Sequence, residues 1–186
     1  MSRPDKSVLT LKKEAKMAKA IKVVTNKVRF SYAHVFQPQA SEEGKQPKYS
    51  VSILIDKGDK ETIDKINKAV EQCKEENKSV WGGTVPKGLK GGLRDGDAEK
   101  DDPAYANCYF INANSTQKPG VVDAEMNAII DANEFYSGCY GRASISFFAY
   151  NTAGSKGVGC GLNNLQKLED GERLGGSTTA ADDFAV

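Results

Sequence analysis

The sequence predicts a mainly β domain with one main α-helix and long loops. Several segments alternate apolar with polar residues and are rich in β-branched and aromatic side chains, which is typical of half-buried strands. One segment, residues 60–79, instead has a helical periodicity of apolar residues. The chain has 186 residues, of which 39% are hydrophobic, and this is enough for one domain with a buried core.

The first two predicted strands lie in residues 21–36 and 49–55. In the first, Val28, Phe30 and Tyr32 recur with period two, and a break is expected near Asn26. The intervening loop contains Pro38, Gly44 and Pro47 and carries both signs of charge. The second strand alternates four apolar or aromatic residues with polar or smaller ones, so one of its faces is expected to be buried; these residues are Tyr49, Val51, Ile53 and Ile55.

Residues 60–79 predict the main helix, with Asp59 as its N-cap. Ile63, Ile66, Val70 and Cys73 follow one another at three- and four-residue spacings, which places them on one face. Residues 81–103 contain six glycines and two prolines and are expected to be a loop, with or without short strands. The rest of the domain is β-rich, with strands expected at 105–112, 120–123, 128–131, 138–150 and 157–168.

These strands, with one helix after the second strand, are compatible with an OB-fold, a five-stranded Greek-key barrel that commonly binds oligonucleotides. Charge divides the chain further. Residues 1–27 carry eight basic and two acidic side chains, whereas residues 169–186 carry one and five. We therefore expect a basic flexible arm at 1–20, the barrel at 21–170 and a disordered acidic tail at 171–186.

Composition argues against several classes of function. The formal net charge is +1, so total charge indicates no particular partner. No apolar run is long enough to span a bilayer and the N-terminus lacks an apolar signal sequence, which predicts a cytoplasmic protein with no membrane partner. The glycine-rich segments match no nucleotide-binding loop, and we expect no cofactor.

Catalytic and metal-binding groups are sparse in the sequence. The only histidine, His34, is flanked by apolar residues and has no recognisable nucleophile as partner. The four cysteines are widely separated, which favours reduced thiols in a core over a zinc site. The acidic run at 95–102 lacks the glycine and glutamate of a calcium loop and is interpreted as a solvated loop; its acids are Asp95, Asp97, Glu99, Asp101 and Asp102.

Basic and aromatic residues interleave on the predicted strands, and this is the positive signal for function. Exposed aromatic rings stack on bases of any sequence, while Lys and Arg bind the phosphates, so the mixture is typical of a single-strand binder. Most of the aromatic residues must nevertheless be core, and tyrosines are better candidates than phenylalanines because a hydroxyl tolerates a wet surface. The predicted contact residues are Arg29, Tyr32, Lys48, Tyr49, Trp81, Lys87, Arg94, Tyr105, Tyr140, Arg142 and Tyr150.

Three runs then indicate a family: KVRFSYAHVFQPQ, PKYSVSILIDKGDKETIDKINKAVEQCKEE and GCYGRASISFFAYNTAGSKGVGCGLNNLQKL. Together they resemble the replicative single-stranded-DNA-binding proteins of tailed bacteriophages, and the resemblance covers roughly residues 21–168, in order. The resemblance implies an OB-fold that coats single-stranded DNA during phage replication, recombination and repair in the cytoplasm of the bacterial host. It also implies an acidic tail with a terminal aromatic residue that contacts replication proteins, here matched in kind by Asp182, Asp183 and Phe184.

The tail departs from the family pattern, because Ala185 and Val186 follow Phe184 and only two acids precede it. The basic first twenty residues have no place in that pattern. We also consider homo-oligomers formed on the DNA. Two other classes of function are compatible with the sequence: a small metal-dependent phage nuclease that uses the acidic loop at 95–102, and an assembly protein whose β-rich body packs only against its own copies.

Overall fold

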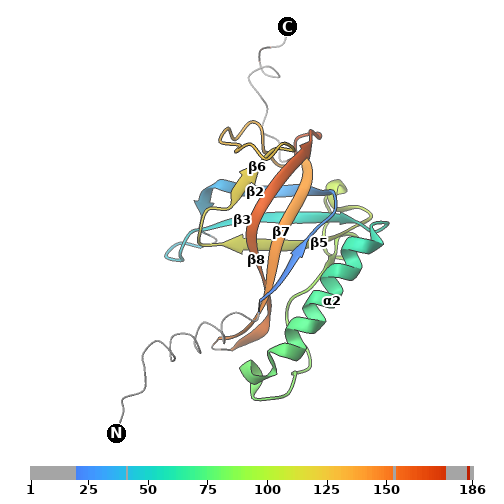
Figure 1. Cartoon of the computed structure of the whole chain (residues 1–186), viewed down its shortest axis with the longest axis vertical. Helices are drawn as coiled ribbons and strands as arrows, with labels where there is room; N and C mark the ends of the chain where they lie inside the picture. Colours follow the sequence, from blue (N-terminus) through green and yellow to red (C-terminus); the bar gives the residue numbers. More distant parts are fainter. Residues whose placement is uncertain (1–19, 41, 153, 175–183, 185–186) are drawn as a thin grey trace.

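The computed structural model describes residues 20–40, 42–152, 154–174 and 184. Its core is a β-barrel with one long helix against it, and long loops connect the elements (Figure 1). The predicted arm at 1–20 therefore lies outside the described residues except for Ala20. In chain order the elements are β1 (Ile21–Val24), β2 (Val28–Gln39), β3 (Lys48–Asp56), α2 (Lys60–Glu76), η1 (Lys78–Trp81), β4 (Arg94–Asp95), α3 (Gly96–Glu99), η2 (Pro103–Tyr105), β5 (Cys108–Ser115), β6 (Gly120–Val122), β7 (Tyr140–Thr152) and β8 (Ser155–Glu169).

Five strands close on themselves to form the barrel. The ladder runs β2–β3–β5–β8–β7 and returns to β2, with β5 and β8 parallel and the other pairs antiparallel. β1 continues the line of β2 along β7, and β6 pairs with β8 beyond the end of β5. This is the closure of a five-stranded OB barrel, so the predicted fold class is confirmed.

Alternation along each strand fills the barrel interior. Val51, Ile53 and Ile55 of β3 point inward, and Ile111 and Ala113 of β5 do the same. Other inward side chains come from the remaining strands, and Ile66, Val70 and Cys73 of α2 join the same cluster from outside the barrel. A smaller core lies on the outer surface of the sheet, where η2 places Tyr105 over Leu54 and Phe110.

Helix α2 agrees with the prediction in its start and its buried face. The Asp59 side chain accepts a hydrogen bond from the Thr62 amide and so caps the helix. Its C-terminal end comes at Glu76, three residues earlier than expected. There the Asn77 side chain bonds the Cys73 carbonyl, and the chain tightens into η1. The helix lies along one side of the barrel (Figure 1).

Parts of the second half of the domain differ from expectation. The strand expected at 105–112 lies at Cys108–Ser115, because Pro103–Tyr105 form η2 instead. Residues 128–131 do not form a strand; Ala128 makes a single bridge to Val122, and the Ile129 amide bonds the Val121 carbonyl. The long loop after η1 contains a two-residue strand, β4, and the short helix α3. Both lie beside β5, because Arg94 and Asp95 pair with Phe110 and Tyr109.

Candidate nucleic-acid interface

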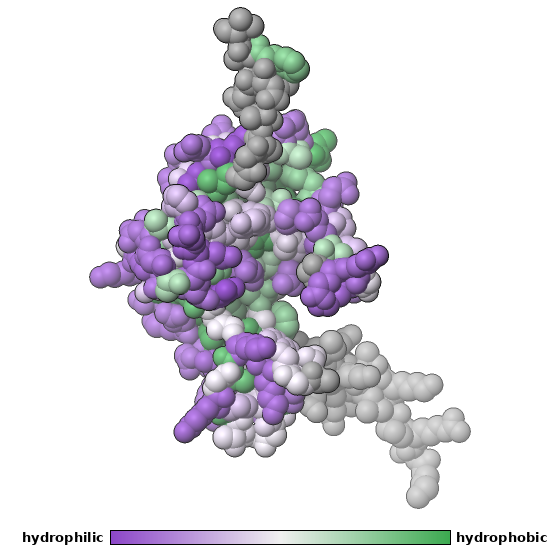
Figure 2. All heavy atoms as spheres, turned by 180° about the vertical axis from the view of Figure 1, so that it is seen from behind, coloured by the Kyte–Doolittle hydropathy of each residue, from purple (hydrophilic) through white to green (hydrophobic). Residues whose placement is uncertain are grey.

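A groove of about 410 Å³ runs over the outer face of the barrel, between β3 and β5 on one side and the β7–β8 hairpin on the other. In OB-folds this face carries the oligonucleotide site. We call it the aromatic groove; it is lined by Lys48, Gly91, Gly92, Arg94, Ile111, Asn112, Asn114, Phe148, Tyr150, Val158, Gly159 and Cys160. Seen from behind, hydrophilic side chains cover most of the molecule and apolar residues show mainly in a central band (Figure 2).

Phe148 and Tyr150 form one wall of the aromatic groove. In the β7–β8 ladder they lie opposite Gly159 and Gly157. A Cβ built on Gly159 would lie 2.4 Å from Cζ of Phe148, and one on Gly157 would lie 2.7 Å from Oη of Tyr150. Both rings therefore rest on bare backbone where any other residue would push them away. Phe148 is 43% exposed to solvent.

The wall is held from outside the hairpin. Trp81 Nε1 donates to the Tyr150 carbonyl at 3.1 Å, and Asn151 Nδ2 donates to the Val80 carbonyl at 3.1 Å. On the β8 side the Val158 amide donates to the Lys90 carbonyl at 2.8 Å. The neighbouring Gly91 passes so close to β8 that a Cβ there would lie 2.1 Å from the Val158 carbonyl oxygen. The groove is therefore built before any ligand enters it.

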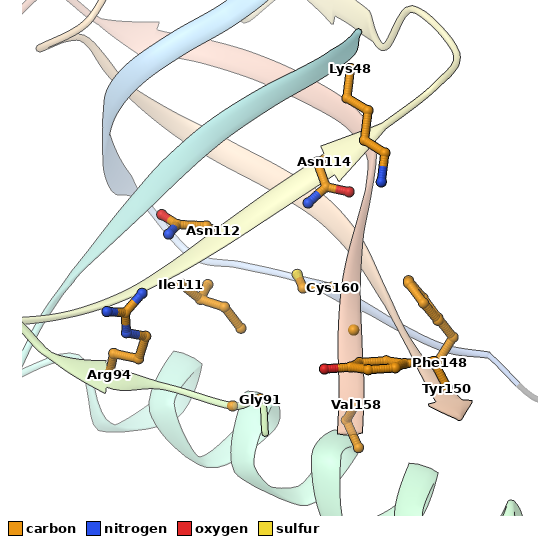
Figure 3. A pocket seen from close by; sticks show the side chains of 12 residues that line it. Lys48, Gly91, Arg94, Ile111, Asn112, Asn114, Phe148, Tyr150, Val158 and Cys160 are labelled. Carbon is orange, nitrogen blue, oxygen red and sulfur yellow. The ribbon is translucent and has the colours of Figure 1, made fainter. Parts of the chain in front are cut away.

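Cationic and amide side chains form the opposite side (Figure 3). Arg94 lies across the groove from the two rings, with its guanidinium carbon 4.7 Å from the Phe110 centroid and bonds to Glu99. Exposed Lys48 stands at one end, near Asn114. Lys48 and Asn114 also line an adjoining hollow of about 560 Å³ that contains Lys45. The two hollows thus adjoin at Lys48 and Asn114, and we call them together the channel.

The structure brings three of the predicted contact residues together in this groove: Lys48, Arg94 and Tyr150. Sequence reasoning missed Phe148, Asn112 and Asn114. Phe148 had a signal, because it lies two residues before Tyr150 on the same strand face and Gly157, Gly159 and Gly161 alternate on the partner strand. It was left out because tyrosines were preferred to phenylalanines as candidates for stacking on bases.

Other predicted residues lie elsewhere on the surface. Arg29 and Tyr140 line a separate hollow, and Tyr32 is exposed on β2. Arg142 bonds the Thr25 carbonyl and lines a third hollow, next to Met126. Lys87 is exposed in the loop between η1 and β4. Tyr49 is half-buried and shares the inward side of β3 with Val51, so it cannot lie on the same face as Lys48.

Trp81 and Tyr105 are core residues, which corrects their prediction as stacking residues. Trp81 is 8% exposed and its indole N–H is bonded to the Tyr150 carbonyl. Tyr105 is 1% exposed, and its hydroxyl donates to Ser52 Oγ at 2.9 Å. A base cannot stack on a ring that protein atoms already cover. Trp81 nevertheless supports the site, because it fixes the strand that carries Tyr150.

Four of the five carboxylates of the acidic loop are engaged within the protein. Lys57 Nζ lies 2.8 Å from Asp95 and 2.6 Å from Asp97, and these hydrogen bonds lower the pKa of both carboxyls. Glu99 bonds Arg94, and Asp102 caps η2. Within the described ranges no group of three His, Cys, Asp or Glu side chains is placed to hold a metal ion.

The thiols are free, as predicted, and Cys73, Cys139 and Cys160 are buried. Burial raises the pKa of Cys160 to about 12, so its thiol stays protonated. Of the predicted tail residues, Asp182 and Asp183 lie outside the described residues, and Phe184 is 79% exposed. No helix in the described part of the chain has the length and apolar character needed to cross a bilayer.

Fold and groove together define an OB-fold protein with a preformed surface of aromatic rings and cations. The model of the family described as "Enterobacter phage Enc34, ssDNA-binding protein" matches residues 21–186. The chain therefore belongs to this family, and the resemblance to phage single-stranded-DNA-binding proteins is confirmed.

Individual relatives agree with the family. The single-stranded-DNA-binding protein of bacteriophage Enc34, solved in complex with ssDNA, is 27% identical, with a TM-score of 0.73 over 83% of this chain and 90% of that one. The single-stranded-DNA-binding protein gp2.5 of bacteriophage T7 is 15% identical, with a TM-score of 0.58 over 85% and 97% of the two chains, and shares the fold. Protein p50 of Acyrthosiphon pisum secondary endosymbiont phage 1 is 28% identical over 88% of this chain and 92% of its own length.

Proposed function

We propose that this protein binds single-stranded DNA along the aromatic groove, without reading its sequence, and coats it during phage DNA replication. One observation carries this assignment to the groove: Phe148 and Tyr150 lie on a glycine strand and face Lys48 and Arg94 across a preformed channel on the OB face. The similarity to the single-stranded-DNA-binding protein of bacteriophage Enc34, which was solved in complex with ssDNA, supports it.

The chemistry of the groove suits unpaired bases. Each base offers a π-face, and stacking on an aromatic ring contributes roughly 1 to 3 kcal/mol per base whatever the sequence. Because Phe148 and Tyr150 are held in place by backbone, little rotamer freedom is lost when a base arrives. Lys48 and Arg94 lie across the groove from the two rings, where they can bind phosphates. The side-chain amides of Asn112 and Asn114 can form hydrogen bonds with base edges or sugars.

Binding of this kind needs no catalytic group, and we propose that the protein is not an enzyme. Of the acids that a nuclease would use, Asp95 and Asp97 are bonded to Lys57, Glu99 is bonded to Arg94, and Asp102 caps η2, which supports a structural role for the acidic loop. We place the protein in the cytoplasm of the bacterial host, where phage DNA is copied. Phe184, exposed near the chain end, stays our candidate for contact with replication proteins.

Affinity for fluorescently labelled oligo-dT, measured by anisotropy, tests the groove. Phe148→Ala and Tyr150→Ala should each weaken binding by about tenfold, because each removes one stacking platform. Ile130→Ala is the matched control: it removes an apolar side chain that is 88% exposed and does not line the groove. Unchanged affinity in both groove variants, with wild type binding tightly, would show that DNA binds elsewhere.

A further inference from the structure

We propose that the bound strand does not end in the aromatic groove but crosses Tyr32 and continues into a second hollow around Tyr140. This inference rests on the proposed function and deepens it, because it gives the protein a longer DNA-binding site than the groove alone. We call the second hollow, of about 380 Å³, the Tyr140 hollow; Lys27, Arg29, Leu54 and Asp56 are among its lining residues.

The Tyr140 hollow lies on the same outer face as the channel. Ser50 of β3 lines the channel, and Leu54, four residues further along the strand, lines the Tyr140 hollow. Four residues of extended chain span about 13 Å. Asn114 and Cys108 of β5 repeat the same order, one in the channel and one in the hollow. Between them the face is closed by Tyr105, bonded to Ser52, so a strand that reaches both must pass over this row.

Tyr32 stands at this crossing. Ser31 pairs with Ser52 and His34 with Ser50, so β2 carries one extra residue between the two hollows, which is a β-bulge. Tyr32 lies in this bulge with φ of +46°, a conformation that L residues with large side chains rarely adopt. Its ring is nevertheless 58% exposed and fills no core. Such strain is commonly kept at binding sites, and here it projects an aromatic ring where the path requires one.

The far end offers an aromatic ring between two cations. Lys27 Nζ lies 5.8 Å and the Arg29 guanidinium carbon 5.3 Å from the centroid of Tyr140. Arg29 is fixed by bonds to the carbonyls of Gly138 and Glu172. Lys27 pairs with Glu169 at 2.8 Å, but both side chains are more than half exposed, at 53% and 59%. An exposed ion pair of this kind is worth little, so a phosphate can replace Glu169 at Lys27.

Occluded site size and affinity for oligo-dT of increasing length test the proposal. The double variant Lys27→Gln/Tyr32→Ala should leave the shortest tightly bound oligonucleotides unaffected, weaken long ones by about tenfold and shorten the occluded site. Phe148→Ala, in the aromatic groove, should weaken short and long oligonucleotides alike. Arg29 is left intact because its bonds to backbone carbonyls hold residues 138 and 172 in place.

Thermal unfolding of each variant shows whether the fold is kept, and Lys27→Glu alone, which leaves Tyr32 intact, should reproduce the length dependence. The proposal that DNA continues into the Tyr140 hollow would be overturned if the double variant and Lys27→Glu bound long oligo-dT as tightly as wild type. An equal loss of affinity for short and long oligonucleotides would also overturn it. Neither result would contradict the assignment of DNA binding to the aromatic groove. If the wild-type protein binds no single-stranded DNA, the proposed function itself is wrong. In that case Phe148→Ala would also show no loss of affinity, which distinguishes this outcome from a failure of the Tyr140 hollow alone.

Discussion

Gly159 determines how the Phe148 ring is presented, although it contributes no side chain of its own. A Cβ at this position would meet the ring at 2.4 Å, whereas one at Gly161 would lie 3.7 Å from Cε1 of Phe148, an ordinary contact. The two glycines are two residues apart on the same face of β8, yet only one supports the ring closely. Stacking therefore depends on a missing side chain as well as on an aromatic one.

We expect Gly159→Ala to weaken oligo-dT binding by about fivefold or more, because the added methyl group displaces a ring whose stacking contributes roughly 1 to 3 kcal/mol. Gly161→Ala is the matched control and should change affinity by less than about twofold, since its methyl group is accommodated. Fluorescence anisotropy titrations of both variants measure their affinities for oligo-dT. Equal affinities would show that the ring position is unimportant for binding.

At the scale of elements, η1 and the β7–β8 hairpin act together. The buried indole of Trp81 lies against the core, and its N–H holds the carbonyl of Tyr150, so the 3₁₀ turn fixes the end of the strand that bears the aromatic wall. The loop that follows then returns to bond β8 through Lys90. η1, which lines neither hollow of the channel, thus helps to determine where the contact residues lie.

Trp81→Phe removes this hydrogen bond and keeps a smaller aromatic ring in the core. Both the lost bond to the Tyr150 carbonyl and the lost packing lower stability, so unfolding free energy in urea should fall by roughly 1 to 3 kcal/mol. We expect oligo-dT affinity to fall by a few fold as the end of β7 loosens. Val80→Ala, at a half-buried neighbour in the same turn, controls for lost packing alone. A loss of affinity no greater than in this control would assign Trp81 to stability only.

At the scale of the whole molecule, charge is local rather than global. The formal net charge is only +1, so we expect attraction for DNA to come from local groups of cations, and the channel contributes Lys45, Lys48 and Arg94. Lys48 is central among them, because it lines both hollows of the channel.

The salt dependence of binding should reveal this arrangement. For single strands the logarithm of the binding constant falls with the logarithm of salt concentration by about 0.7 per phosphate contacted. Lys48→Ala should reduce that slope by about 0.7, because one contact is lost. Lys68→Ala, on the exposed face of α2, should leave it unchanged. Titrations at several salt concentrations give both slopes, and equal reductions would mean that binding follows net charge.

Much of the fold could be predicted because it depends on local patterns. The spacing of Ile66, Val70 and Cys73 and the cap at Asp59 are properties of a short segment, and the structure confirms both. The site could be predicted only in part. Lys48 and Tyr49 are neighbours in sequence, but alternation in β3 places them on opposite faces.

The sequence by itself determined the fold class, the main helix, most of the strands and the kind of side chains that a single-strand binder needs. These follow from periodicity and residue type, which neighbouring residues set. Only the tertiary structure decided which aromatic rings are exposed. Trp81 and Tyr105 are covered and Phe148 is presented because of residues that lie far away in sequence, such as Tyr150 for Trp81 and Ser52 for Tyr105. Exposure is a property of the closed barrel, since it depends on which strands and loops meet.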